Sequence, residues 1–166
     1  MIEKNDKTMT HNILTFLISG QTFALPLDKI VNLIEKPSIK NEFGNDGLPI
    51  LKVEFNGVLI PIYNISIYIG KKNNTSIRNG FLLIVETAIQ KVQTLIGIHI
   101  DSLPEVVEIE DYQMFSYPPV SESYPSFIAS AIVCHEGEEI TMIDIDSMFD
   151  KEKMRMKTLQ EQFLSW

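Results

Sequence analysis

The chain has 166 residues, of which 45% are hydrophobic and 22% charged, a composition that supports one folded domain with a substantial core. Its formal net charge of −8 argues against a nucleic-acid partner, because neutralising phosphates requires a basic surface. No run reaches the roughly 18 apolar residues of a membrane span, so direct membrane insertion is not expected. A single cysteine and a polar N-terminal stretch without a signal-peptide pattern predict a cytoplasmic location.

The first third of the chain consists of short apolar runs separated by turn residues, a pattern typical of sandwiches and barrels. Strands are predicted at residues 13–19 and 22–25, and Pro26 ends the second because it lacks a backbone N–H. Residues 27–33 change to helical spacing, which predicts a short helix. Residues 36–47, with one proline, two asparagines and two glycines, are predicted to be irregular.

The clearest local signal is the dipeptide Asn56-Gly57, which separates two apolar runs at residues 51–55 and 58–63. Asn-Gly between alternating runs is the preferred type I′ hairpin turn, because both residues tolerate positive φ. We therefore expect a two-residue hairpin here. Beyond it, residues 64–69 are predicted to form a short helical turn and residues 71–80 a loop.

The second half of the chain repeats the strand-and-turn pattern. Strands are predicted at residues 81–85, 92–100, 103–109, 127–134 and 140–145. The last two are expected to form a hairpin around Glu136-Gly137, whereas residues 111–126 are expected to be a loop. From Asp146 onward the spacing becomes helical. About nine or ten strands, two or three helices and no alternation of strand with helix predict a mainly β fold.

Residues with catalytic or metal-binding potential do not converge in the sequence. His11 is expected in the N-terminal tail, His99 in a strand and His135 beside a turn, each without an obvious carboxylate partner. Cys134 ends an apolar run and is predicted to be a small buried hydrophobic residue. An acidic cluster fits either a solvated strand edge or electrostatic matching to a basic partner; it comprises Glu105, Glu108, Glu110 and Asp111. We therefore expect no enzyme activity, no metal and no cofactor.

Four blocks, in order, resemble the CheW-type adaptor domains of bacterial chemosensory systems. They are residues 23–30 (FALPLDKI), 57–61 (GVLIP), 95–101 (LIGIHID, followed by Val106-Val107) and 128–145. The resemblance covers about residues 12–150. It implies two SH3-like five-stranded β-barrel lobes around a shared hydrophobic core, with a short helix after the second strand and a C-terminal helix. Residues 1–11 would be a flexible tail, and residues 151–166 an amphipathic helix or tail.

The resemblance also implies a non-catalytic job. The domain would bridge the cytoplasmic tip of a methyl-accepting chemoreceptor to the regulatory domain of a CheA-type histidine kinase. Two alternatives remain open at this point. One is a CheW-like scaffold for another partner, such as a pilus-motility or polarity system, and the other is a small-ligand-binding or enzymatic barrel with a polar pocket.

Receptor binding in the family uses a groove between the lobes, which assigns a set of candidate residues by resemblance. They are Ile30, Asn32, Leu33, Asn56, Gly57, Ile96, Gly97 and Ile98. A side chain at Gly97 would then block close approach of receptor helices while leaving most of the core intact. The family's usual arginine is replaced by Asn56 and a frequent acidic residue by Asn32. Either Asn56 simply serves the tight turn, or the groove is retuned for an unusual receptor or no longer serves a receptor.

Overall fold

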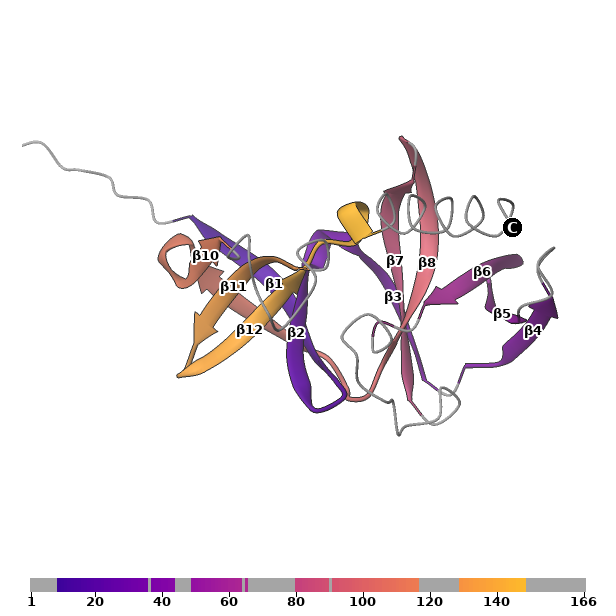
Figure 1. Ribbon diagram of the computed structural model, residues 1–166, viewed down its shortest axis with the longest axis horizontal. Helices are drawn as coiled ribbons and strands as arrows, with labels where there is room; N and C mark the ends of the chain where they lie inside the picture. The colour runs from indigo at the N-terminus through magenta and orange to yellow at the C-terminus, as the bar shows by residue number, and fades with distance from the viewer. Residues whose placement is uncertain are drawn as a thin grey trace, which may run out of the picture.

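The computed structural model describes residues 9–35, 37–43, 49–63, 65, 80–89, 91–116 and 129–148. Twelve strands in these ranges form two six-stranded sheets. Each curled sheet, with its connecting turns, forms one lobe, and Figure 1 shows the two lobes side by side. No helix in the described ranges is long and apolar enough to span a membrane.

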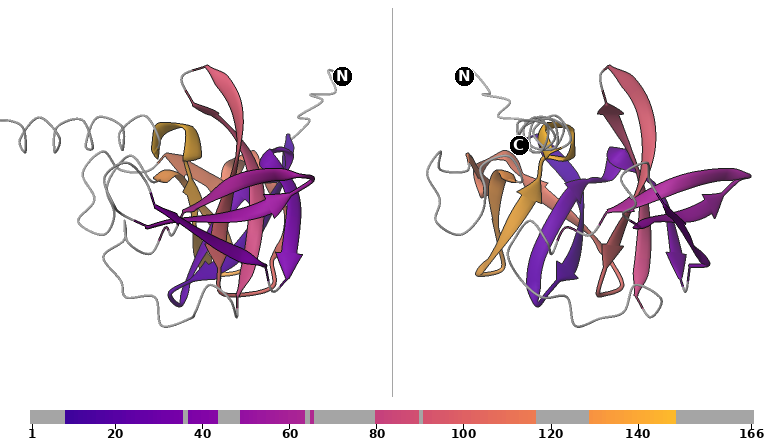
Figure 2. Two further views of the ribbon diagram at one scale, coloured as in Figure 1. Left: turned by 90° about the vertical axis from the view of Figure 1, so that its right-hand side faces the viewer. Right: turned by 45° about the vertical axis from the view of Figure 1, so that its right-hand side comes forward.

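The first lobe is built from both ends of the chain. Its strands, in sheet order, are β10 (Met114–Ser116), β11 (Ala129–His135), β12 (Glu138–Ile143), β2 (Gln21–Pro26), β1 (Thr10–Ile18) and β9 (Glu105–Glu110). The neighbours are antiparallel except β12 and β2, which run parallel. A 3₁₀ turn, η3 (Asp111–Gln113), joins β9 to β10. In Figure 2 this lobe carries the orange strands.

The second lobe is inserted between β2 and β9. Its strands, in sheet order, are β3 (Ile30–Glu35), β7 (Phe81–Ile89), β8 (Val92–Ile100), β6 (Val58–Tyr63), β5 (Pro49–Phe55) and β4 (Ile39–Phe43). The 3₁₀ turn η1 (Leu27–Lys29) carries the chain across from β2 to β3. The magenta and purple strands of this lobe lie at the opposite end of the molecule from the orange ones in the right-hand view of Figure 2.

Three hydrophobic cores follow from the alternation of strand side chains between two faces. The shared core lies between the lobes; it includes Leu14, Phe16, Ile18, Phe23, Leu25, Leu83, Val85, Ile96, Ile98 and Ile143. The lobe-one core lies inside the first curled sheet and includes Ile13, Ala24, Ile109, Val133 and Met142. The lobe-two core lies inside the second and comprises Val53, Ile60, Leu82 and Ile84. β1, β2, β7 and β12 each contribute buried residues to two cores. On β8, residues 96–100 are all buried, so both faces of that part of the strand are covered.

Both predicted hairpin turns are confirmed. Asn56 and Gly57 have φ values of 51° and 79° between the paired strands β5 and β6. Glu136 and Gly137 have φ values of 49° and 75° between β11 and β12. Positive φ at both central residues is what a type I′ turn requires, and it matches the twist of the flanking strands.

The mainly β, two-lobed architecture is confirmed, with six strands in each sheet instead of five. The helix predicted for residues 27–33 is wrong beyond η1, because residues 30–33 belong to β3 and pair with β7. A bulge at Val31 shifts that pairing, so Ile30 and Leu33 both pack on the shared core. They are three positions apart, which is the spacing expected on one face of a helix and explains the wrong prediction. The irregular segment predicted for residues 36–47 contains β4.

Three local expectations are also corrected. His11 lies in β1, not in a tail, and its Nε2 contacts the carboxylate of Asp111. Cys134 is exposed because it points away from the lobe-one core, the opposite face from its neighbour Val133. The C-terminal helix begins as predicted, with residues 145–148 helical. The predictions for residues 1–8, 64, 66–79, 117–128 and 149–166 lie outside the described residues.

Candidate partner-binding surface

Half of the residues assigned to a groove meet in the shared core. Ile30 and Leu33 are partly buried on β3 and pack against that core. Leu33 pairs with Leu83, and Leu83 pairs with Ile98 on β8. Ile96 and Ile98 are both 0% exposed. Their side chains therefore hold the two lobes together, and only Ile30 and Leu33 of this group have surface to offer a partner.

Gly97 lies on the other face of β8. A Cβ built there would be 3.3 Å from both Cδ atoms of Leu82 and 3.4 Å from Cγ1 of Ile62. Leu82 belongs to the lobe-two core, and Gly97 is itself buried. The expectation that a side chain here would leave the core intact is therefore wrong, since even a methyl group would be tightly confined.

The two asparagines that replace the family's charged residues have separate local roles. Asn56 is exposed at the β5–β6 turn, where its φ of 51° accounts for asparagine without a partner protein. Asn32 is exposed on β3, and its Oδ1 accepts a hydrogen bond from the backbone N–H of Leu33 at 2.8 Å. In the order of the sheet, β7 and β8 separate β3 from β6. These observations favour the turn explanation for Asn56.

Val106 is an exposed apolar residue at the rim of the shared core that the groove assignment omitted. It pairs with Leu14 across β9 and β1, and Leu14 pairs in turn with Leu25 of β2. Leu14 and Leu25 belong to the shared core, whereas Val106 is 61% exposed. Paired residues project to the same face of a sheet, so Val106 continues the shared-core face outward. In the sequence, Val106 and Val107 stand between Glu105 and Glu108, and this apolar pair among acidic residues is the signal that could have identified Val106.

Leu27 and Ile30 also pack against the shared core while remaining partly exposed. We give the name interlobe surface to these two residues together with Val106, which lies on the shared-core face of β9. η1, β3 and β9 position these three side chains, and η1 and the β8–β9 connection are where the chain passes between the lobes. An apolar partner side chain laid on this surface would extend the shared core, which is how a helix packs into a hydrophobic groove.

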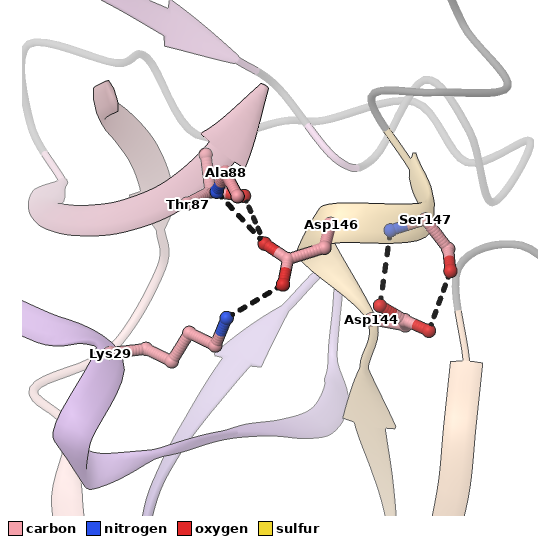
Figure 3. Close-up of polar contacts among 6 residues, drawn as sticks. All are labelled: Lys29, Thr87, Ala88, Asp144, Asp146 and Ser147. Carbon is pink, nitrogen blue, oxygen red and sulfur yellow. Dashed lines mark hydrogen bonds and ion pairs between the residues drawn. The ribbon is translucent and has the colours of Figure 1, made fainter. Parts of the chain in front are cut away.

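A polar cluster beside η1 fastens the C-terminal helix to the second lobe, as Figure 3 shows. The carboxylate of Asp146 accepts hydrogen bonds from Lys29 Nζ at 2.9 Å, from the backbone N–H of Ala88 at 3.2 Å and from the Thr87 hydroxyl. Lys29 belongs to η1, and Thr87 and Ala88 belong to β7. Asp146 therefore joins three segments far apart in the sequence. We call these four residues the Asp146 latch.

The helix start itself is fixed by Asp144. Its two carboxylate oxygens accept hydrogen bonds from the backbone N–H of Ser147 at 3.1 Å and from its hydroxyl at 2.8 Å (Figure 3). This is the N-cap arrangement, in which a side chain satisfies a helical N–H that has no partner within the helix. The two aspartates of the Ile143-Asp-Ile-Asp146 block thus have different structural roles, one capping the helix and one docking it.

Burial of Asp146 acts to raise its pKa, but the hydrogen bonds from Thr87 and Lys29 outweigh that effect and hold the pKa below its ordinary value. The carboxylate is therefore ionised at neutral pH. A group whose pKa is lowered by folding stabilises the protein fully above its unfolded-state pKa, about 4 for aspartate, and loses that contribution as the pH falls below it.

A double-mutant cycle on Lys29→Met and Asp146→Asn is expected to give a coupling free energy of about 0.5–1 kcal/mol at pH 7. The value is modest because both side chains are partly exposed and screened by solvent. Urea denaturation of the four proteins measures it, and the coupling should be smaller at pH 3, where part of the Asp146 carboxylate is protonated. Equal coupling at both pH values would contradict the assigned ion pair.

A pocket of about 510 Å³ opens at one end of the first lobe. Its described lining residues are Thr10, His11, Asn12, Ile13, Pro26, Leu27, Asp28, Met114 and Met142. Two of these residues are ionisable, His11 and Asp28. A catalytic site would need several ionisable groups directed at one point, and the described lining of this pocket does not provide them. Within the described ranges, no three His, Cys, Asp or Glu side chains are arranged to hold a metal ion.

These features define a two-lobed, mainly β domain in which apolar residues around the shared core remain partly exposed. The CheW-like domain model matches residues 12–153, and the chain belongs to the CheW-like domain family, whose members are non-catalytic adaptors of chemotaxis-related signalling.

A solved structure supports the fold assignment. The chain resembles the crystal structure of the scaffolding protein TtCheW from Thermoanaerobacter tengcongensis with a TM-score of 0.70. The match has 19% sequence identity and covers 85% of this chain and 93% of that one. A search of curated proteins found no match. At this level of identity the structural likeness establishes the shared architecture.

Proposed function

We propose that this protein is a scaffold that couples the cytoplasmic tip of a chemoreceptor to the regulatory domain of a CheA-type histidine kinase. Membership of the CheW-like family supports the scaffold role. The observation that carries the receptor part is Val106, an exposed valine on the shared-core face. Leu27 and Ile30 pack against the same core and are also partly exposed. Receptor tips are helical, and this surface suits one apolar stripe of a helix.

In the proposed binding mode, apolar side chains at the surface contact the receptor helix and the buried core supports them. Leu27, Ile30 and Val106 supply apolar contact with the receptor helix, while the shared core behind them provides a rigid base. Leu33, which also packs against the shared core, completes the proposed receptor site. Asn32 pairs with Ile84 on the other face of β3 and, like the Asn56-Gly57 turn, is not required for the site. The kinase regulatory domain contacts a separate face, so the two partners bind at the same time.

Val106→Asp is expected to weaken binding of a soluble receptor-tip fragment at least about tenfold, because the receptor helix would then have to bury a charge where it otherwise covers an apolar side chain. The protein should stay folded, since Val106 is 61% exposed. Val92→Asp is the matched control: it makes the same change at a valine 64% exposed, at the start of β8. Titration calorimetry with the receptor tip and with the kinase regulatory domain measures both affinities.

Receptor affinity that survives Val106→Asp, or falls equally in Val92→Asp, would remove the interlobe surface from the proposal.

Co-purification from a cell extract distinguishes the chemosensory scaffold from a CheW-like scaffold that serves another partner. Recovery of both a chemoreceptor and a histidine kinase supports the chemosensory scaffold. Recovery of neither, with a pilus-motility or polarity protein instead, would reassign the scaffold to that system.

A further inference from the structure

The two lobes differ sharply in charge. The described part of the first lobe, residues 9–29, 101–116 and 129–148, contains eleven carboxylate side chains and one lysine, Lys29. That lysine is already bound by Asp146 in the latch. The described part of the second lobe contains four carboxylates and three lysines, which nearly balance. Among the described residues, the acidic side chains are thus concentrated on one lobe, where they produce a directional field.

Aromatic side chains are exposed within this acidic lobe. Phe115 on β10 pairs with Ile132 on β11, on the side of the sheet that faces away from the lobe-one core, and it is 55% exposed. Tyr112 on η3 is 70% exposed. η3 is held against the end of β11 because Gln113 Nε2 donates a hydrogen bond to the Cys134 carbonyl at 3.1 Å. Because η3 leads directly into β10, the two exposed aromatic residues lie three positions apart at the same end of the sheet.

Carboxylates border these rings. Glu139 pairs with Cys134, which lies on the same outer face as Ile132 and Phe115. The Glu110 carboxylate accepts a hydrogen bond from the Tyr112 hydroxyl, and this bond raises the pKa of the tyrosine. Glu136 is exposed at the adjacent β11–β12 turn. In the described sheet order, β10 is an edge strand with no neighbour on one side. We call this region the β10 face, comprising Tyr112, Phe115, Ile132, Glu136 and Glu139.

We propose that the β10 face is a second protein-binding surface, which takes an arginine-bearing segment of a partner. Guanidinium groups stack on aromatic rings and pair with carboxylates, so a surface with both features favours them. Among the described residues at this face, His135 is the one basic side chain, and its Nε2 lies 3.8 Å from Oε1 of Glu136. Phe115 and Ile132 supply the apolar contact, while Glu136 and Glu139 attract and orient the basic side chains. None of these residues belongs to the interlobe surface, so the proposal is independent of receptor binding.

The test uses a short, acetylated and amidated peptide of alternating arginine and leucine, titrated into the full-length protein. NMR shifts should saturate and map to Tyr112, Phe115 and Glu139, and the bound peptide should slow alkylation of Cys134 on the same face. Phe115→Ala and Glu139→Lys should each weaken binding at least about fivefold. Glu108→Lys makes the same charge change at an exposed position on β9 of the same lobe and should leave affinity within about twofold.

The controls distinguish a defined surface from general attraction to an acidic lobe. A peptide of alternating glutamate and leucine should not bind. Equal weakening by Glu108→Lys and Glu139→Lys would overturn the proposal, because it would show diffuse attraction. Shifts that map outside the β10 face, or unchanged affinity in Phe115→Ala, would overturn it as well.

Discussion

Gly97→Asp is expected to lower the free energy of unfolding by about 3 kcal/mol or more. The new side chain would start 3.3 Å from both Cδ atoms of Leu82 and 3.4 Å from Ile62, on the buried face of β8. A carboxylate there has no described cation within the lobe-two core, so it must either remain unpaired in apolar surroundings or disrupt the sheet. Chemical denaturation monitored by fluorescence or circular dichroism measures the loss.

Gly97→Ala is the matched control. It adds the same Cβ without the charge, and the flexible ends of Leu82 and Ile62 are the atoms that must yield, so the expected loss is about 1 kcal/mol. Equal stability of Gly97→Asp and the natural protein would show that the site is open, and would restore Gly97 as a direct receptor contact. If the loss occurs, weaker receptor binding by this variant reports unfolding, and Val106→Asp is the informative change.

The features that could be predicted from the sequence are those decided by neighbouring residues. The Asn56-Gly57 and Glu136-Gly137 turns need positive φ at two adjacent positions, and the alternating runs beside them identify the strands. β3 could not be predicted in this way. Its apolar residues follow a helical spacing because a bulge at Val31 shifts the pairing with β7, and that bulge exists only in the assembled sheet.

The candidate site was harder to predict because β8 is buried on both faces. Alternation identifies a strand that is half exposed, but it does not say which of Ile96, Gly97 and Ile98 faces solvent when none of them does. The Asp146 latch had no local signal either, since Lys29 and Asp146 lie 117 positions apart. Val106 was visible as an apolar residue among glutamates, but only its pairing with Leu14 places it beside the shared core.

Gly80→Ala is expected to destabilise the second lobe by about 2–3 kcal/mol, because the residue packs directly on a buried histidine. A Cβ at Gly80 would lie 2.2 Å from Nε2 of His99 and 2.9 Å from the carbonyl oxygen of Ile100. His99 is 2% exposed, and burial holds its pKa below the ordinary value despite the opposing effect of Asp101, so the ring is neutral at neutral pH. The ring is closely confined and has little room to move aside.

The double-mutant cycle with His99→Ala isolates that contact. His99→Ala alone should destabilise the protein by leaving a cavity, but it also removes the ring that a methyl group at position 80 would strike. Gly80→Ala with His99→Ala should therefore cost at least about 1 kcal/mol less than the two single losses added together. The remaining cost of the pair reflects the 2.9 Å approach to the Ile100 carbonyl, which His99→Ala does not relieve. Strictly additive losses in urea denaturation would show that the backbone contact, and not the histidine, is what requires glycine at this position.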